Sequence, residues 1–561
     1  MPDKSFNLVE KPWIKVLDNN GNSEIVSLTD LFKNAANYQR LAGEMATQDL
    51  AILRLLEAIL TTVYSRLNSK GEAYEELELD DHFRVIDHDD DDDEEIVSAY
   101  SDTWGELFRK GSFTRAVTDY LEKNSDCFDF FGSNPFYQVN KEVYDSQVPA
   151  NKKIDVDKPK GTVSVKQINR TISESNNSPA IFSPKSPDDK NKISLDELIR
   201  WIITYQNYTG VTDKTKVNTK EKFSVSAGWL YGLGTVYAQG NNLFETLMLN
   251  LVFPEEYREQ KPVWEFETPI KYIEFLKTNP ETSGLSVSTL YTLWSRMLHI
   301  EWQNNEPIIF TAGLPKLSTT MAFNEPMTTW RKNKDGEYYP AMKHQNDLNR
   351  AMWRNFGQYV ATNKSSDNNF HEPGITSWLK KIEKQLPNDY FVTLKTTNFI
   401  SDGNATSQSP VAQDNDSFNI RANVLLDSDV ASENFWPKNI EDVIKLTQSV
   451  GQEFWRFNNN VVTKLRNLDN TEIVNNMTQH FYESLNRPFL NWLASLRNDQ
   501  ERSQKKQEWV ETLKQIAFSE ANQVVKNASP RDIIGIKKDQ DVVNIFTYYN
   551  WYKLNILRIL K

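Results

Sequence analysis

Two Asp-His pairs near residue 85 have the side chains that could most directly support catalysis. Asp81-His82 and Asp87-His88 each place a carboxylate beside an imidazole, and both groups bind the divalent ions of metal-dependent phosphohydrolases. Both pairs lie in or beside an acidic run at 87–95, whereas catalytic ligands must be buried and held in a fixed geometry. A run of like charges is typical of a solvated loop. We therefore interpret the run as a loop and keep a metal-dependent phosphohydrolase using Asp81-His82 as the alternative function.

The other motifs with catalytic potential are incomplete. The six histidines include no two at metal-ligand spacing on one helix face, and His371-Glu372 lacks the second histidine of a zinc-protease motif. The glycine-rich segment 228–234 completes neither the dinucleotide fingerprint nor the phosphate-binding loop. The single cysteine, Cys127, excludes a disulfide within the chain and a zinc site built from thiolates. The sequence therefore predicts a protein that is not an enzyme and has no cofactor or metal.

The net charge of −13 is unevenly distributed along the chain. Residues 80–95 hold ten acidic residues and one arginine, a net of −9, which is most of the imbalance. Residues 141–230 hold 15 basic and 11 acidic residues, a net of +4. A basic face that binds nucleic acid is therefore compatible with an acidic protein. No apolar run is long enough for a membrane span and the first residues lack a signal-peptide core, so we expect a cytoplasmic protein.

The first part of the chain mixes strand and helix signals. We predict a strand within 6–16, a buried helix at 48–64, a strand-loop element at 128–139, a helix at 194–208, a polar loop at 209–222 and a helix at 346–362.

From about Pro437 the apolar residues recur at helical spacing. Four long periodic segments joined by short links are typical of an antiparallel four-helix bundle, in which Pro488 should kink or split the second helix. The frequent aromatic residues at 546–552 fit either core packing or an exposed partner surface. Because 561 residues are too many for one core, we predict an α+β fold with a mixed domain at 1–432 and the bundle at 433–561.

Nine sequence blocks, taken in order, cover nearly the whole chain. They are NLVEKPWIKV at 7–16, SLTDLF at 27–32, FDFFGSNPFYQV at 128–139, GNNLFETLMLNL at 240–251, PVWE at 262–265, LYTLWSR at 290–296, EPMTTWR at 325–331, RAMWRNF at 350–356 and HFYESLNRPFLNWLASL at 480–496. Their order and spacing resemble the CasA family, the large subunit of the type I-E CRISPR Cascade surveillance complex. Several of the blocks are interpreted as core packing motifs.

The resemblance implies a role in antiviral defence. A CasA-like subunit docks on the other Cascade subunits and the CRISPR guide RNA, and it tests double-stranded target DNA for a protospacer-adjacent motif. It reads that motif from the minor groove, helps open the duplex and recruits a helicase-nuclease effector, without cutting DNA itself. A protein scaffold that does not contact DNA is a further alternative.

The resemblance also implies three DNA-contacting loops, of which the first is rich in glycine. It corresponds to 209–216, where only Gly210 remains of the glycine cluster of some relatives. Thr212, Lys214 and Lys216 could contact phosphates or base edges there instead. An ordinary solvated loop is the alternative.

The second and third loops carry a lysine finger and a glutamine wedge. The finger corresponds to Lys316, which follows a Gly-Leu-Pro turn. The wedge corresponds to 403–409, with Gln408, Ser409 and Asn404 as its DNA-binding candidates. An inserted amide can replace some of the hydrogen bonds that a base pair loses when it opens.

A proline-stiffened loop at 173–190 occupies the position of the segment that contacts the guide-RNA end of the complex in this family. Phe182 is the candidate docking residue, because an aromatic side chain can stack or fill a neighbouring pocket. Disorder until assembly is the alternative for this loop.

Overall fold

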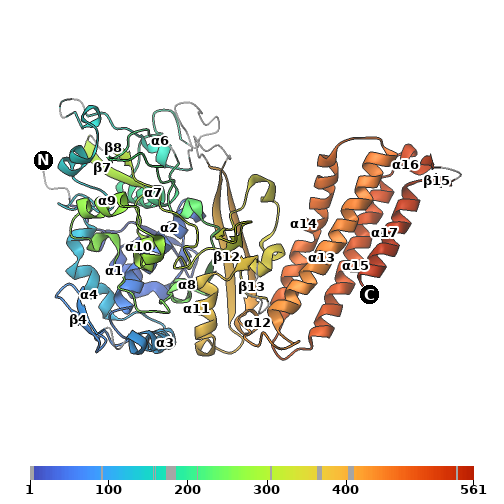
Figure 1. Cartoon of the computed structure of the whole chain (residues 1–561), viewed down its shortest axis with the longest axis horizontal. Helices are drawn as coiled ribbons and strands as arrows, with labels where there is room; N and C mark the ends of the chain where they lie inside the picture. Colours follow the sequence, from blue (N-terminus) through green and yellow to red (C-terminus); the bar gives the residue numbers. More distant parts are fainter. Residues whose placement is uncertain are drawn as a thin grey trace. The chain divides into compact units, whose positions relative to one another are not determined.

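The chain forms two compact units. The structure is a computed structural model that describes residues 5–89, 93–155, 157, 159–171, 185–210, 213–303, 306–362, 369–401, 410–538 and 541–561 (Figure 1). The first unit comprises Met1–Gln345, Asn369–Gln385 and Leu394–Asp416, and the second comprises Asn346–Asn368, Leu386–Thr393 and Ser417–Lys561.

The first unit contains most of the strands and many short helices. Its helices are α1 (Leu28–Asn34), α2 (Ala46–Tyr64), α3 (Asp93–Lys110), α4 (Arg115–Lys123), α5 (Lys141–Gln147), α6 (Val165–Ile168), α7 (Leu195–Tyr208), α8 (Leu243–Asn250), α9 (Pro269–Lys277), α10 (Val287–Tyr291) and α11 (Gly374–Ile382). Its strands are β1 (Ile14–Asp18), β2 (Ser23–Val26), β3 (Tyr38–Leu41), β4 (Leu77–Leu79), β5 (Val85–His88), β6 (Tyr237–Gln239), β7 (Arg296–Gln303), β8 (Glu306–Gly313), β9 (Trp330–Lys332), β10 (Tyr338–Pro340) and β11 (Phe370–His371). Strands β12 (Phe391–Ser401) and β13 (Pro410–Arg421) contain residues of both units.

Helix α2 forms the centre of the first unit. Nearly all of its residues are buried, which agrees with an apolar sequence that has no polar face, and it packs against α7 and α10. Its two charged interior residues differ in their environments. Arg54 forms a bidentate ion pair with Glu325 at 2.7 and 2.8 Å, whereas both carboxylate oxygens of Glu57 lack a partner among the described residues. Burial raises the pKa of Glu57 well above its ordinary value, because desolvation disfavours the charged carboxylate.

The strands of the first unit form several small sheets instead of one large sheet. Strand orders are β2-β1-β3, β10-β9-β11 and β13-β12-β6, and β4-β5 and β7-β8 are separate pairs. The hairpin β7-β8 is the longest of these two-stranded pairs, and its register places Arg296 opposite Gly313. This end of the hairpin positions the candidate site.

The second unit is built on long helices. It contains α12 (Ala422–Leu425), α13 (Trp436–Asn459), α14 (Thr471–Ser495), α15 (Arg502–Lys526), α16 (Pro530–Ile534), β14 (Ile536–Lys538), β15 (Asp541–Val543) and α17 (Ile545–Ile559). Helices α13, α14, α15 and α17 pack together, which confirms the predicted four-helix bundle and the α+β fold class (Figure 1).

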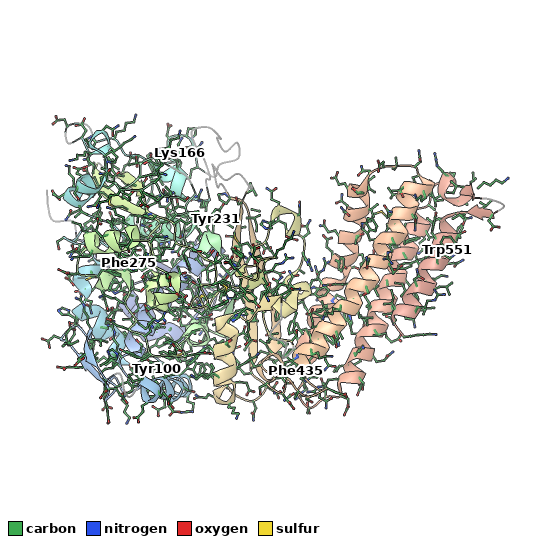
Figure 2. All side chains as sticks on the ribbon, in the orientation of Figure 1. Tyr100, Lys166, Tyr231, Phe275, Phe435 and Trp551 are labelled. Atoms are coloured by element: carbon green, nitrogen blue, oxygen red, sulfur yellow. The ribbon has the colours of Figure 1, made fainter. Side chains whose placement is uncertain are left out.

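Aromatic side chains fill the bundle core. Phe454 stacks on Phe481 with ring centroids 4.8 Å apart, and the hydroxyl of Tyr552 donates to the carbonyl of Ala517 at 3.2 Å. Trp551, by contrast, is half exposed on α17 (Figure 2). The aromatic residues near the end of the chain therefore divide between the core and the surface of the bundle.

Several predictions about individual elements were accurate. Helices α2 and α7 begin and end within two residues of the predicted ranges. No described helix is both long and apolar enough to cross a membrane.

Other predictions were wrong. The helix expected at 346–362 is reduced to a 3-10 segment, Met352–Gln358, with non-helical dihedrals at Asn355. Its apolar residues are used for tertiary packing, because Trp353 stacks on Phe489 with centroids 4.1 Å apart. Helix α14 continues through Pro488, so of the two expected effects of this proline the split does not occur. The segment 128–139 packs on the core as predicted, but it forms the end of a 3-10 helix and a loop and contains no strand.

Candidate nucleic-acid interface

The predicted lysine finger lies on a segment that follows β8 and pairs with residues 224–226. Lys316 is exposed, while the neighbouring Pro315 and Leu317 are buried. The backbone N–H of Lys316 donates to the carbonyl of Ser224 at 2.8 Å, and Val225 forms an antiparallel bridge with Pro315. The backbone at Lys316 is therefore held against the segment 224–226, while its side chain is exposed.

The segment with Lys216 lies along the same end of β8. Lys216 forms a parallel bridge with Gly313, supported by hydrogen bonds from the Gly313 N–H to Thr215 and from the Val217 N–H to Gly313. The Lys216 ammonium donates to its own loop at the carbonyl of Phe223, 3.1 Å away. Lys216 therefore also stabilises the loop from which it extends.

Gly313 makes this arrangement sterically possible. A Cβ atom at this position would lie 2.6 Å from a methyl group of Val225. The outgoing and returning segments of the loop can therefore both approach β8 only because residue 313 has no side chain.

Arg296 fixes the two ends of the loop. Its buried guanidinium donates to the carbonyls of Gly210, at 2.9 Å, and Ser226, at 2.5 Å. Gln206 at the end of α7 accepts hydrogen bonds from the backbone N–H groups of Ser295 and Arg296. Burial lowers the pKa of Arg296, but a guanidinium remains charged at neutral pH. One buried cation thus joins α7, β7 and both ends of the segment 210–226.

Gly228 closes the loop against α7. Its φ of +88° lies in the left-handed region, and a Cβ atom there would be 2.3 Å from the carbonyl oxygen of Asn207. Both facts require glycine. The glycine-rich segment that matched no phosphate-binding motif therefore has a structural function, which is a close approach of two backbones.

The loop and the finger together expose positive charge. The exposed lysines are Lys214, Lys216, Lys220, Lys222 and Lys316, and the acidic residues among them are Asp213 and Glu221. Five positive and two negative groups give a net of +3 on a protein whose total charge is −13. Such a cluster can contact the phosphates of nucleic acid.

The remaining predicted site residues divide into two groups. Gly210 is buried with its carbonyl directed at Arg296, so it anchors the loop. The other group, which lies outside the described residues, consists of Thr212, Asn404, Gln408, Ser409 and Phe182. Ser401, the last described residue before the wedge segment, lines the same cavity as Lys316. The flank of the wedge segment and the lysine finger therefore border one site.

The Asp81-His82 pair lies on the turn between β4 and β5. Both residues are exposed, and the Nδ1 atom of His82 is 2.8 Å from the carbonyl of Lys123. Among described residues, no three His, Cys, Asp or Glu side chains are arranged to hold a metal ion, and residues 90–92 lie outside that description.

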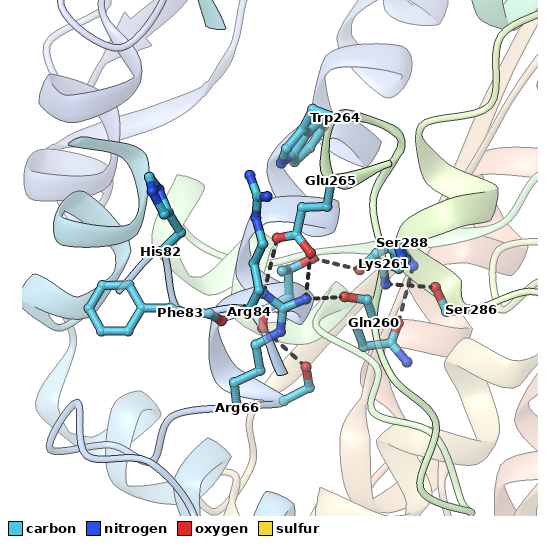
Figure 3. A network of polar contacts seen from close by, with 12 residues as sticks. Arg66, His82, Phe83, Arg84, Gln260, Lys261, Trp264, Glu265, Ser286 and Ser288 are labelled. Atoms are coloured by element: carbon cyan, nitrogen blue, oxygen red, sulfur yellow. Dashed lines mark hydrogen bonds and ion pairs between the residues drawn. The ribbon is translucent and has the colours of Figure 1, made fainter. Parts of the chain in front are cut away.

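A buried network holds this turn in place (Figure 3). The guanidinium of Arg66 pairs with Glu265 at 2.7 Å, and it also donates to the carbonyls of Phe83 and Gln260. Glu265 additionally accepts a 2.5 Å hydrogen bond from the hydroxyl of Tyr120. The Glu265 carboxylate thus makes structural contacts with Arg66 and Tyr120.

The fold of the chain is shared by solved structures. Thermobifida fusca Cse1 shares it at a TM-score of 0.75 and 21% identity, over 99% of this chain and 97% of that one. Thermus thermophilus CasA (Cse1) gives 0.68 and 17%, and a chain of a CRISPR RNA-guided surveillance complex gives 0.64 and 14%, each over 99% of both chains. No curated protein gives a significant sequence match.

The sequence itself identifies the family. The family model for CRISPR-associated protein Cse1 matches residues 7–519. The chain belongs to the CRISPR-associated protein Cse1 family, which confirms its resemblance to CasA.

The residues that sequence reasoning missed are those that shape the site. They are Arg296, Gln206, Gly228 and Gly313. None of them presents a functional group at the surface, and their roles depend on partners distant in sequence. Two signals were present, since Arg296 ends the LYTLWSR block and Gly228 begins the glycine-rich segment.

Proposed function

We propose that this chain is the non-catalytic DNA-recognition subunit of a type I-E CRISPR RNA-guided surveillance complex. It binds the other subunits and the guide RNA, recognises a protospacer-adjacent motif in double-stranded DNA through the minor groove, helps open the duplex and recruits the helicase-nuclease. Family membership supports the assignment to this class of complex, and one of the structures with a similar fold is a chain of a CRISPR RNA-guided surveillance complex.

The observation that carries the proposal is the rigid presentation of Lys316 beside a second lysine-bearing loop. Guide pairing supplies most of the sequence specificity in such complexes, so the protein needs to read only a short duplex motif. The minor groove is narrow and offers a degenerate pattern of acceptors. A single flexible cation on a fixed backbone suits this groove, while the lysines of the loop suit the flanking phosphates.

The central test is Lys316→Ala in the assembled guide complex. We expect the affinity for duplexes that carry the motif to fall by about tenfold. A loss of this size lies within the discrimination of about 1–3 kcal/mol that one good base contact provides. The matched control is Lys110→Ala, which removes an exposed lysine at the end of α3. Equal loss of affinity in the two variants would show that Lys316 acts only through net charge.

Lys214 and Lys216 should behave differently from Lys316. Each substitution by alanine should weaken binding to all duplexes alike and reduce the slope of log affinity against log salt by about one. Metal-dependent DNA hydrolysis by the pure protein that is lost in His82→Ala would contradict the non-catalytic assignment. Unchanged duplex binding by a complex that lacks this subunit would favour the scaffold alternative.

A further inference from the structure

A cavity of about 220 Å³ is lined in part by the segment Pro315, Lys316 and Leu317. Its wall contains the aromatic residues Trp229, Tyr231 and Trp294, and Lys316 and Ser401 also line it. All of these residues belong to the first unit. The volume is below the roughly 300–1,000 Å³ of pockets for drug-sized ligands, and it suits one small planar ring system.

The two indole rings are held rigidly. The Nε1 atom of Trp229 donates to Glu325 at 2.6 Å, and Glu325 is itself fixed by the buried ion pair with Arg54. The ring of Trp294 packs edge-on against Tyr272 with centroids 5.2 Å apart, and its backbone N–H donates to the Tyr272 hydroxyl at 2.9 Å. These flat surfaces are therefore formed before any ligand arrives.

The lining combines aromatic side chains with one cation. Trp229, Tyr231 and Trp294 can stack on a flat ring, and Lys316, which also lines the cavity, supplies a cation for an attached phosphate. A nucleobase with its phosphate has both features.

We propose that this cavity receives one nucleobase that leaves the duplex when the DNA opens beside the recognised motif. The inference rests on the proposed function and adds a second role to it. Opening a base pair exposes rings that lose their stacking, and an aromatic pocket restores part of that stacking without reading sequence. The cavity therefore favours the opened state of the duplex, whereas Lys316 favours its initial binding.

Gly232 provides a variant that fills the cavity without removing its walls. It lines the cavity at the end of the 3-10 helix Leu230–Gly232, and an added Cβ atom would make only an ordinary contact, 3.5 Å from Thr319. We expect Gly232→Leu to slow duplex opening by about tenfold and to leave the initial motif-dependent binding nearly unchanged. The matched control is Gly284→Leu, because Gly284 ends another 3-10 helix, Thr282–Gly284, and faces open space.

Photocrosslinking tests the cavity directly. Duplexes selected for tight binding to the assembled complex would carry 5-iododeoxyuridine at successive positions beside the motif, on either strand. Wild type and Gly284→Leu should each crosslink from one position to peptides containing Trp229, Tyr231 or Trp294, and Gly232→Leu should lose that crosslink.

The outcomes separate this inference from the proposed function. Suppose that wild type binds the motif but gives no crosslink to these peptides from any position. This result would overturn the proposed role of the cavity and leave the proposed function intact. A Gly232→Leu complex that opens duplex at the wild-type rate would do the same. Failure of the wild-type complex to discriminate between motifs would overturn both.

Discussion

The backbone N–H of Lys316 donates a 2.8 Å hydrogen bond to the carbonyl oxygen of Ser224. This bond joins the segment after β8 to the returning segment of the loop that carries Lys214 and Lys216. The backbone of each segment therefore helps to position the lysines of the other. A change that displaces either segment should affect DNA binding through both.

Arg296→Lys should separate the anchoring of the loop from the overall stability of the protein. Lysine keeps the charge but cannot reach the carbonyls of Gly210 and Ser226 with a planar fork. We expect the free energy of unfolding to fall by about 1–3 kcal/mol and motif-dependent DNA affinity to fall by about tenfold. Denaturant titration and duplex binding by the assembled complex would measure the two effects.

The matched control for this experiment is Arg66→Lys. Arg66 is equally buried and also donates to two backbone carbonyls, but its ion pair with Glu265 supports the β4-β5 turn. We expect a similar loss of stability with unchanged DNA affinity. A similar loss of DNA affinity in the two variants would show that Arg296 acts only through general stability.

Gly228→Ala should destabilise the protein by about 3 kcal/mol or more. The new methyl group would meet the carbonyl oxygen of Asn207 at 2.3 Å, in addition to the strain of a φ of +88°. Gly336→Ala is the control, because Gly336 has a φ of +89° and an added Cβ atom would meet only the Lys332 side chain, at 4.0 Å. Thermal unfolding of both variants would separate the steric contact from the backbone strain, and equal shifts would rule out the contact.

Asp49→Asn should change how stability depends on pH. Burial raises the pKa of Asp49 to about 6 from 3.8, against the opposing effects of the Gly43 N–H, Arg40 and Lys395. The folded state therefore binds more protons than the unfolded state between pH 4 and 6. The free energy of unfolding consequently falls as the pH rises through this window.

We expect the stability of wild type, measured relative to Asp49→Asn, to fall by about 2–3 kcal/mol between pH 4 and pH 7. Denaturant unfolding at four pH values would measure this difference. A difference that does not vary with pH would show that the aspartate ionises normally in the folded protein.

Gln408→Ala tests the wedge, which lies outside the described residues. Because an inserted amide replaces hydrogen bonds of an opened base pair, its loss should slow duplex opening more than initial binding. Stopped-flow fluorescence of a duplex labelled beside the motif would follow both steps. Identical opening rates in wild type and variant would refute the wedge assignment.

The sequence by itself determined the class of fold and the family. Helical periodicity predicted α2, α7 and the bundle, because long apolar stripes specify a buried helix face whatever the tertiary context. The α-helix predicted at 346–362 does not form, for the opposite reason. Trp353 and Phe356 are apolar at short spacing, but their packing in the second unit, and not local helix preference, decides their conformation.

The tertiary structure alone decided how the site is assembled. Lys316 could be singled out by resemblance to a family, yet nothing near it in sequence indicates Ser224, Val225 or Arg296 as its supports. These relationships are hydrogen bonds and close backbone approaches between distant segments, and they depend on where α7, β7 and β8 end in space. The sequence pattern predicts which residues are buried, but it does not predict which buried residues contact one another.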